Sequence, residues 1–434
     1  MGQAGSSEIS IFGEGEMEAE FEKHGGNGNI SVKDLISDGY DLVIDLIIRP
    51  TRAKYTLDAL GPPSFELEDP LTQAPIYVSR TDRVVLNERQ LGLACTHWNL
   101  LEDDRVTVKP APCLIYLHSN VGSRKDALRV RDIGLRLGFS VFAFDFSGSG
   151  RSDGIYVTMG WLESSDLKYI LDDLDACDSV TSIAFFAHSM GCYPAILNVA
   201  SRSQQTAELA IKGSPIDAIP HIFRKWNVEP YAKRITGLVF DGAYSTMDQC
   251  IDDLVLNVKN EGFGAPKLVL KAAAHFIQKS VENRTGVRLE FLRPVDVAAA
   301  IPSIPALFVC GSVDKYVGPA HTHELAAAYG GPCAKVVVDG ADHYSPRPTQ
   351  VYQLSMLFLR HHLTSSSSSS AINEAAVSMS PLYQSQLHTI LTHTSRPSQH
   401  YSLPTSPSNN MTSPSLSHTS KYIGSMCRTD NAAF

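Results

Sequence analysis

The chain has 434 residues, 43% of them hydrophobic, so it can bury one large core or two ordinary ones. Its formal net charge is −9 and it has no long run of Lys or Arg, which argues against a nucleic-acid partner. The eight cysteines are widely spaced and form no C-x-x-C pair, so a zinc site or a disulfide scaffold is not expected, and a reducing, cytoplasmic compartment is favoured.

The N-terminal residues 1–40 are acidic and Gly-rich, and we expect a flexible arm. They begin MGQAGSS, which matches the N-myristoylation pattern with Gly2 as acceptor, although a terminus of small residues can also match by chance. One myristoyl chain gives only weak, reversible binding. No secretory signal and no bilayer-spanning run is visible, so we expect a cytoplasmic protein whose membrane contact, if any, is peripheral.

Strand signals begin beyond a short apolar element at 41–55. Two segments near 76–98 predict a strand pair from their β-branched and aromatic content. Six short apolar runs then alternate with helical stretches, which is typical of parallel strands buried on both faces. These runs end at His118, Asp145, Ala187, Asp241, Gly311 and Asp339. The pattern predicts an α/β fold with its chemistry at the C-terminal ends of the strands.

The composition predicts where the folded domain ends. It should cover residues 41–362, and its segment 242–303 exceeds a normal crossover, so we expect a helical cap over the strand ends. Residues 363–434 are rich in Ser, Thr and Pro, and we expect a disordered tail because so few apolar residues cannot offset the entropy of ordering.

Residues 187–191 read AHSMG, which matches the G-x-S-x-G nucleophile elbow except that Ala187 replaces the first glycine. An apolar strand precedes the pentapeptide and a helical segment follows it, as the elbow requires. We therefore predict Ser189 as the nucleophile. His188 alternates away from Ser189 and should be a packed side chain, while Cys192 falls inside the helix, where it is badly placed for thiol chemistry.

Two later loops supply the partners that a serine nucleophile needs. Asp314 and His343 each follow an apolar run, so the order Ser, Asp, His on successive strand ends is that of an elbow enzyme. We predict His343 as general base and acid, and Asp314 as the carboxylate that orients its ring. Each could singly be an ordinary loop residue. Asp342 is the alternative acid, but it adjoins His343 and is badly placed to face the ring. This chemistry needs no metal and no cofactor.

The loop that begins at His118 should complete an oxyanion hole. We predict backbone donors at Met190 and Asn120, with Val121 as the near alternative to Asn120 and His118 as a loop-shaping side chain.

Several co-linear motifs resemble those of α/β-hydrolase-fold proteins grouped with the serine aminopeptidase S33-like hydrolases. The motifs are YLHSNVGSR at 116–124 and FDFSGSGRSDG at 144–154. The match is closest to a largely uncharacterised eukaryotic branch through IRPxRAxY at 48–55, IPALF at 304–308 and DHxSPRP at 342–348. The resemblance covers about residues 40–362.

This resemblance implies a hydrolase of acyl ester, thioester or amide bonds, and its label does not by itself imply peptidase activity. Two departures from the family pattern stand out, Ala187 before the elbow and Ser119 in place of the usual glycine of HGN. A side chain at Ser119 could narrow the oxyanion loop, because glycine there allows close backbone approach, and we expect an effect on turnover rate rather than on fold.

Lysines and a histidine recur every four residues in the expected cap, beside apolar positions. They are Lys267, Lys271, His275 and Lys279, flanked by Leu268, Ala272 and Phe276. Such a face can touch anionic lipid or an acidic substrate, although it is more often simply solvated. It favours a membrane-proximal acyl substrate, either a small molecule such as a lipid ester or an S-acylated protein, the latter by analogy with depalmitoylases. The rival hypothesis is a catalytically silent scaffold that binds a ligand or partner.

Overall fold

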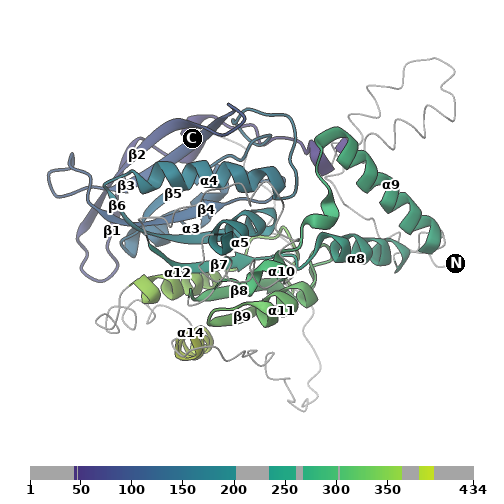
Figure 1. The fold of residues 1–434 in the computed structure, drawn as a ribbon. Coiled ribbons are helices and arrows are strands. Elements are labelled where there is room, and N and C mark those ends of the chain that lie inside the picture. The colour runs from purple at the N-terminus through teal and green to yellow at the C-terminus, as the bar shows by residue number, and fades with distance from the viewer. Residues whose placement is uncertain are drawn as a thin grey trace, which may run out of the picture. The chain divides into compact units, whose positions relative to one another are not determined.

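The computed structural model describes residues 44–45, 47–201, 234–260, 267–301, 304–363 and 381–394. A nine-stranded sheet lies at the centre of these residues, in the order β1-β2-β3-β5-β4-β6-β7-β8-β9 (Figure 1). The strands are β1 (Ser64–Glu68), β2 (Pro75–Leu86), β3 (Gly92–Leu100), β4 (Ala111–Leu117), β5 (Ser140–Phe144), β6 (Val180–His188), β7 (Arg234–Asp241), β8 (Ala306–Gly311) and β9 (Cys333–Val338).

The pairing confirms the strands that the sequence predicts. β2 and β3 form the antiparallel pair, and the six apolar runs are β4 to β9, which pair in parallel with one another. The antiparallel end of the sheet, with β1 beside β2 and β3 beside β5, adds one strand that the sequence did not indicate. The prediction of a mostly parallel α/β sheet is therefore confirmed.

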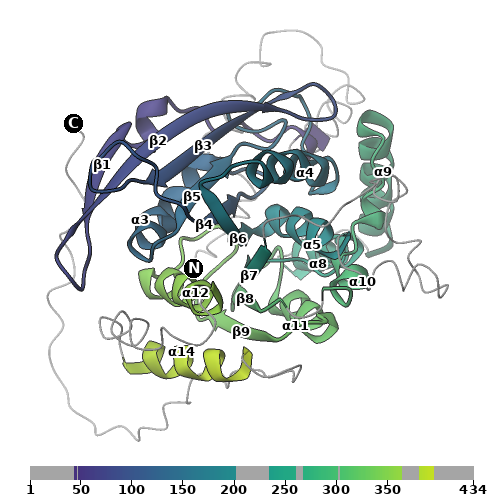
Figure 2. The same cartoon turned by 60° about the vertical axis from the view of Figure 1, so that its left-hand side comes forward.

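Helices cover both faces of the sheet (Figure 2). One face packs against α4 (Trp161–Asp175), α5 (Cys192–Ser201), α10 (Pro294–Ala298) and α11 (Pro319–Ala328), and the other against α3 (Leu128–Arg136) and α12 (Thr349–Leu363). In β6, Phe185 and Ala187 enter the first core while Ala184 and Phe186 enter the second. Successive side chains of a strand point to opposite faces, so a strand covered twice must be apolar throughout.

The motif at 48–55 and the residues just before it pack on the turn after β5. Ile44 and Ile48 are fully buried, and the side chains that follow reach the turn between Asp145 and Tyr156. Arg52 donates to the carbonyl of Ser152 at 2.9 Å, and Tyr55 hydrogen-bonds to the fully buried carboxylate of Asp145. The motif is thus a clamp on the loop that lies next to the predicted oxyanion loop.

The segment 242–303 is largely helical where it is described, with α8 (Met247–Asn260), α9 (Lys267–Thr285), η5 (Leu289–Phe291) and α10. α8 is held on the core by Asp253, which lies 3.3 Å from Nε2 of the buried His321 in α11. Asn257 of α8 donates to the carbonyl of Lys315 at 2.6 Å, in the loop that follows β8. The cap assignment itself stays a prediction.

The expectation of a disordered tail from 363 onward is wrong for one segment. Pro381–Thr394 forms α14, with Leu387 and Ile390 buried against the core that includes α12. Leu387, Ile390 and Leu391 lie at helical spacing and pack on the same core, so a local apolar stripe exists that the average composition of the tail conceals.

The predicted arm at 1–40, its candidate acceptor Gly2, and the tail beyond 394 lie outside the described residues. Within the parts of the chain that the structure describes, no helix combines the length and apolar character needed to cross a bilayer.

Candidate functional site

The elbow lies where β6 meets α5, through the short turn η3 (Ser189–Gly191). Ser189 has a φ of 51°, in the left-handed region, which costs roughly 1–2 kcal/mol for a residue with a side chain. A β-carbon at Gly191 would lie 2.6 Å from the carbonyl oxygen of Leu117, so this position needs glycine. Ala187, by contrast, has its methyl group fully buried in the core, which explains why the departure from glycine is accommodated.

A chain of two short hydrogen bonds joins the three side chains predicted from the sequence. Ser189 Oγ lies 2.8 Å from His343 Nε2, and His343 Nδ1 lies 2.7 Å from Asp314 Oδ2. Because an ionised carboxylate only accepts, Nδ1 carries the proton and Nε2 is free to accept from the hydroxyl. All three residues are buried, with exposed fractions of 7%, 2% and 6% for Ser189, His343 and Asp314. The arrangement can transfer a proton from the serine to the ring.

The second oxygen of Asp314 is held by the backbone. Oδ1 accepts from the N–H groups of Tyr316 at 2.9 Å and Val317 at 2.8 Å, which fixes the plane of the carboxylate. Asp342, the alternative acid, instead accepts from the N–H groups of Tyr344 and Ser345 in its own turn. These backbone hydrogen bonds lower the pKa of Asp342 but turn its oxygens to the loop, not to the ring of His343.

The loop after β4 lies against the elbow, since Gly191 packs on the carbonyls of Leu117 and His118. His118 is fully buried: its Nδ1 is 2.7 Å from the carbonyl of Ser119, and its Nε2 accepts from the N–H of Phe146 at 3.0 Å. Burial lowers the pKa of His118, so the neutral ring that these two contacts require is favoured.

Ser119 is buried and has no positive φ, so its side chain adds no backbone strain. Its carbonyl also accepts from the N–H of Gly122 at 3.0 Å, which closes the turn around Asn120 and Val121. Val121 is exposed, whereas Asn120 is half-buried. Met190 directly follows Ser189 and is buried. The predicted donors at Met190 and Asn120 therefore belong to two segments that pack together at Gly191, and the assignment of these donors stays a prediction.

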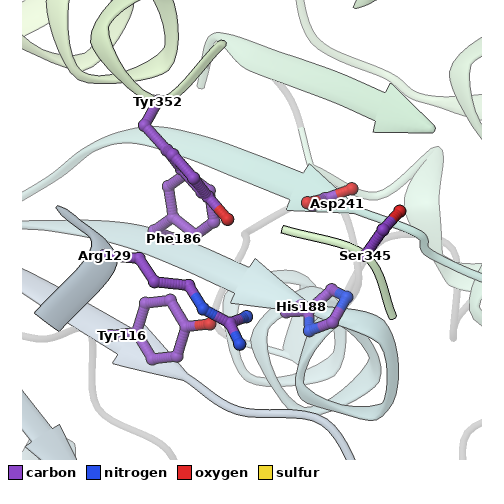
Figure 3. Close-up of a pocket in the computed structure, with 7 residues that line it drawn as sticks. All are labelled: Tyr116, Arg129, Phe186, His188, Asp241, Ser345 and Tyr352. Atoms are coloured by element: carbon purple, nitrogen blue, oxygen red, sulfur yellow. The ribbon is translucent and has the colours of Figure 1, made fainter. Parts of the chain in front are cut away.

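His188 is not part of this chain of hydrogen bonds and lines a small pocket beside it (Figure 3). The pocket is lined by Tyr116, Arg129, Phe186, His188, Asp241, Ser345 and Tyr352. His188 Nε2 lies 3.3 Å from the carbonyl oxygen of His343, and burial lowers the pKa of His188 to about 4. Its neutral ring is buried and stacks on the ring of His343, with the two ring centroids 5.8 Å apart, in agreement with the packed role predicted for it.

Sequence reasoning missed a buried ion pair between Arg347 and Asp241. Arg347 Nε lies 3.1 Å from both carboxylate oxygens of Asp241 and its Nη2 lies 2.9 Å from one of them. In the sequence, Asp241 stands out only as the end of an apolar run and Arg347 only as part of a motif. The signal that could have indicated the pair is the charge of Asp241 at the end of a run that is otherwise predicted to be buried, because a buried carboxylate needs a partner.

Comparison with known proteins is consistent with this fold. The model of the alpha/beta hydrolase family matches residues 126–354, more than half of the chain, and this range includes the elbow, Asp314 and His343. The chain therefore belongs to the alpha/beta hydrolase family, and hydrolase is the class of protein that this membership defines. No curated protein matches the chain.

Solved structures with similarity to the chain include esterases. The Pyrococcus furiosus esterase Pf2001 is 18% identical, with 68% of this chain and 89% of that chain covered and a TM-score of 0.42. Est1E from Butyrivibrio proteoclasticus, solved with ferulic acid bound, is 15% identical, with coverage of 65% and 99% and a TM-score of 0.42. The esterase domain of a Rhodothermus marinus protein is 16% identical, with coverage of 66% and 100% and a TM-score of 0.41.

Proposed function

We propose that this protein is a serine hydrolase that cleaves an acyl ester, thioester or amide through Ser189, His343 and Asp314. The observation that carries the proposal is the continuous chain of hydrogen bonds at 2.8 Å and 2.7 Å from the serine hydroxyl to a carboxylate fixed by two backbone N–H groups. The narrower S33-like assignment rests on the sequence motifs alone.

In the proposed reaction, Ser189 Oγ attacks the carbonyl carbon of the substrate while His343 Nε2 takes its proton. The negative charge on the carbonyl oxygen is stabilised by the N–H groups of Met190 and Asn120. His343 then returns the proton to the leaving alcohol, thiol or amine as the bond to it breaks, which leaves an acyl group on Ser189. Water attacks this acyl-enzyme with the same proton transfers and releases the acid. Asp314 stabilises the imidazolium in both steps.

We further propose a substrate whose acyl chain resides at a lipid surface, as in a lipid ester or an S-acylated protein. Support comes from α9, where Leu268 is 80% exposed and Phe276 is 63% exposed, with Lys271 and His275 also exposed on the helix. An apolar stripe beside basic side chains is the pattern of a helix that lies on a membrane, although Lys271 also pairs with Asp252 at 3.0 Å. Replacing Leu268 and Phe276 with Glu should lower the rate of hydrolysis of a long-chain ester in anionic vesicles. The same variant should hydrolyse a water-soluble short-chain ester at the normal rate. Equal loss of rate on both esters would contradict the proposed lipid-surface substrate.

The test of the hydrolase proposal is labelling of the full chain with a fluorophosphonate probe, with the adduct located by mass spectrometry. We expect an adduct on Ser189 that is absent from Ser189→Ala. Asp314→Asn should slow labelling by about 10⁴-fold, by analogy with loss of the orienting carboxylate elsewhere. Asp342→Asn is the matched control, a neighbouring carboxylate that does not contact the ring, and should label at the normal rate. Folded protein without any adduct would instead support a catalytically silent scaffold.

A further inference from the structure

We infer that the buried Arg347–Asp241 ion pair is a positioning device that holds the backbone of His343 so that its Nε2 meets Ser189. This inference rests on the proposed function, because it concerns the same site. It adds two residues that lie outside the Ser189–His343–Asp314 chain of hydrogen bonds.

Arg347 connects the strand end of β7 with the loop that carries His343. Its Nε and Nη2 bind the carboxylate of Asp241, and its Nη1 donates to the carbonyl of Asp342 at 2.6 Å. Asp342 directly precedes His343 in the chain. The guanidinium is planar and rigid, so one side chain fixes the distance between a strand end and the peptide before the catalytic candidate.

The next peptide is held from the other side. His188, at the end of β6, donates from Nε2 to the carbonyl of His343 at 3.3 Å. Gly242, the residue after Asp241, lies under the ring of His343, because a β-carbon there would be 3.2 Å from its Cε1. Three points therefore define the position of His343: Arg347 holds the preceding carbonyl, His188 holds its own carbonyl, and Gly242 supports its ring.

Stability of the fold does not by itself explain a buried ion pair between Arg347 and Asp241. The side chains of Arg347 and Asp241 are only 2% and 5% exposed, so both charges have lost their water. Buried pairs of this kind often stabilise a fold no better than apolar residues of similar volume do, whereas removal of one partner leaves an uncompensated charge. What an apolar pair cannot replace is the hydrogen bond from Nη1 to the carbonyl of Asp342. The contribution of the ion pair to stability can therefore be tested separately from its role in positioning His343.

The experiment uses this separation in the full chain. Arg347→Met leaves Asp241 unpaired, and the double variant Arg347→Met with Asp241→Leu replaces the whole pair by apolar side chains. Arg347→Lys keeps the charge but not the planar set of donors. Arg89→Met is the control, since it removes the charged partner of another buried carboxylate, Asp166 on α4, which also accepts hydrogen bonds from Asn87 and from the N–H of Ser147. Thermal unfolding, fluorophosphonate labelling rate and the downfield proton NMR signal of His343 Nδ1–H, assigned by its loss in His343→Gln, are measured for each.

We expect the double variant to unfold near the normal temperature but to label at least about tenfold more slowly, as for a misplaced catalytic group, with its downfield signal shifted or broadened. Arg347→Lys should recover only part of the rate, and Arg89→Met should leave rate and signal unchanged. A double variant with normal rate and normal signal would overturn the inference. If even the unaltered protein is not labelled, the proposed function fails, while the NMR signal still reports whether the ion pair positions the ring.

Discussion

Gly242 and Gly340 allow the geometry around His343 to be tested with a matched pair of substitutions. Both glycines have a left-handed φ, +67° at Gly242 and +69° at Gly340, and each lies directly beyond a strand or in the turn that follows it. They differ in what a side chain would meet. A β-carbon at Gly242 would lie 3.2 Å from Cε1 and 3.4 Å from Nδ1 of His343, whereas nothing lies within 4 Å at Gly340. Alanine at either position therefore has the same backbone cost, and only one contacts the ring.

The backbone cost is roughly 1–2 kcal/mol for each substitution, which should lower the unfolding temperature of both variants by about 2–5 °C. At Gly242 the methyl group must also push the ring by a few tenths of an ångström, because carbon contacts are optimal at about 3.5–4.0 Å. That movement acts on two hydrogen bonds of 2.8 Å and 2.7 Å. Since a misplacement of about 1 Å can cost 10²-fold, we expect about a tenfold loss of rate.

The assay is the rate of fluorophosphonate labelling at Ser189, read beside thermal unfolding of the same samples. Gly242→Ala should be about tenfold slower than the unaltered protein, and Gly340→Ala should match the unaltered protein despite equal destabilisation. Equal labelling rates for the two variants would refute the reasoning, since the contact with His343 would then have no consequence for the nucleophile.

Two further predictions concern the folded domain. Burial, reinforced by Arg83, lowers the pKa of His97 from 6.5 to about 3, so only the unfolded state takes up its proton as the pH falls from 7 to 5, and stability is lost through this window. The free energy of unfolding, measured with urea, should therefore be lower at pH 5 than at pH 7. His97→Gln should reduce this difference by about 2 kcal/mol, and an unchanged difference would contradict the prediction. Ile390 is fully buried in α14, so Ile390→Asp should detach this helix. Residues 381–394 should then become sensitive to limited proteolysis while the central sheet stays intact. Continued protection of residues 381–394 in this variant would contradict the packing of α14 on the core.

Much of the fold was predictable because the dominant signal is local. A strand covered on both faces must be apolar at every position, and Ile183, Phe185 and Phe186 of β6 display this within a few residues. β1 was missed for the converse reason. It is a short strand that pairs only with β2, its burial alternates between exposed and half-buried, and so its residues carry no strong pattern.

The residues brought together at the site were predictable because each lies at or soon after the C-terminal end of a strand. Ser189, Asp314 and His343 follow β6, β8 and β9, and parallel strands deliver their C-terminal ends to one edge. The Arg347–Asp241 pair joins residues 106 positions apart, and neither has a local pattern that names the other. α14 was missed because the average composition of residues 363–434 conceals one short apolar stripe of helical period.

The rival scaffold hypothesis can be weighed against the strain at the elbow. A ligand-binding surface has no use for a serine in the left-handed region, since that conformation is costly and persists only where the surroundings enforce it. Here they do: the φ of 51° at Ser189 accompanies a close approach of Gly191 to the carbonyl of Leu117. The same turn directs the hydroxyl to His343 at 2.8 Å, whose other nitrogen meets a fixed carboxylate. Strain, proton acceptor and orienting carboxylate each have a purpose in acyl transfer, and together they have none in simple binding, which is why we propose the hydrolase.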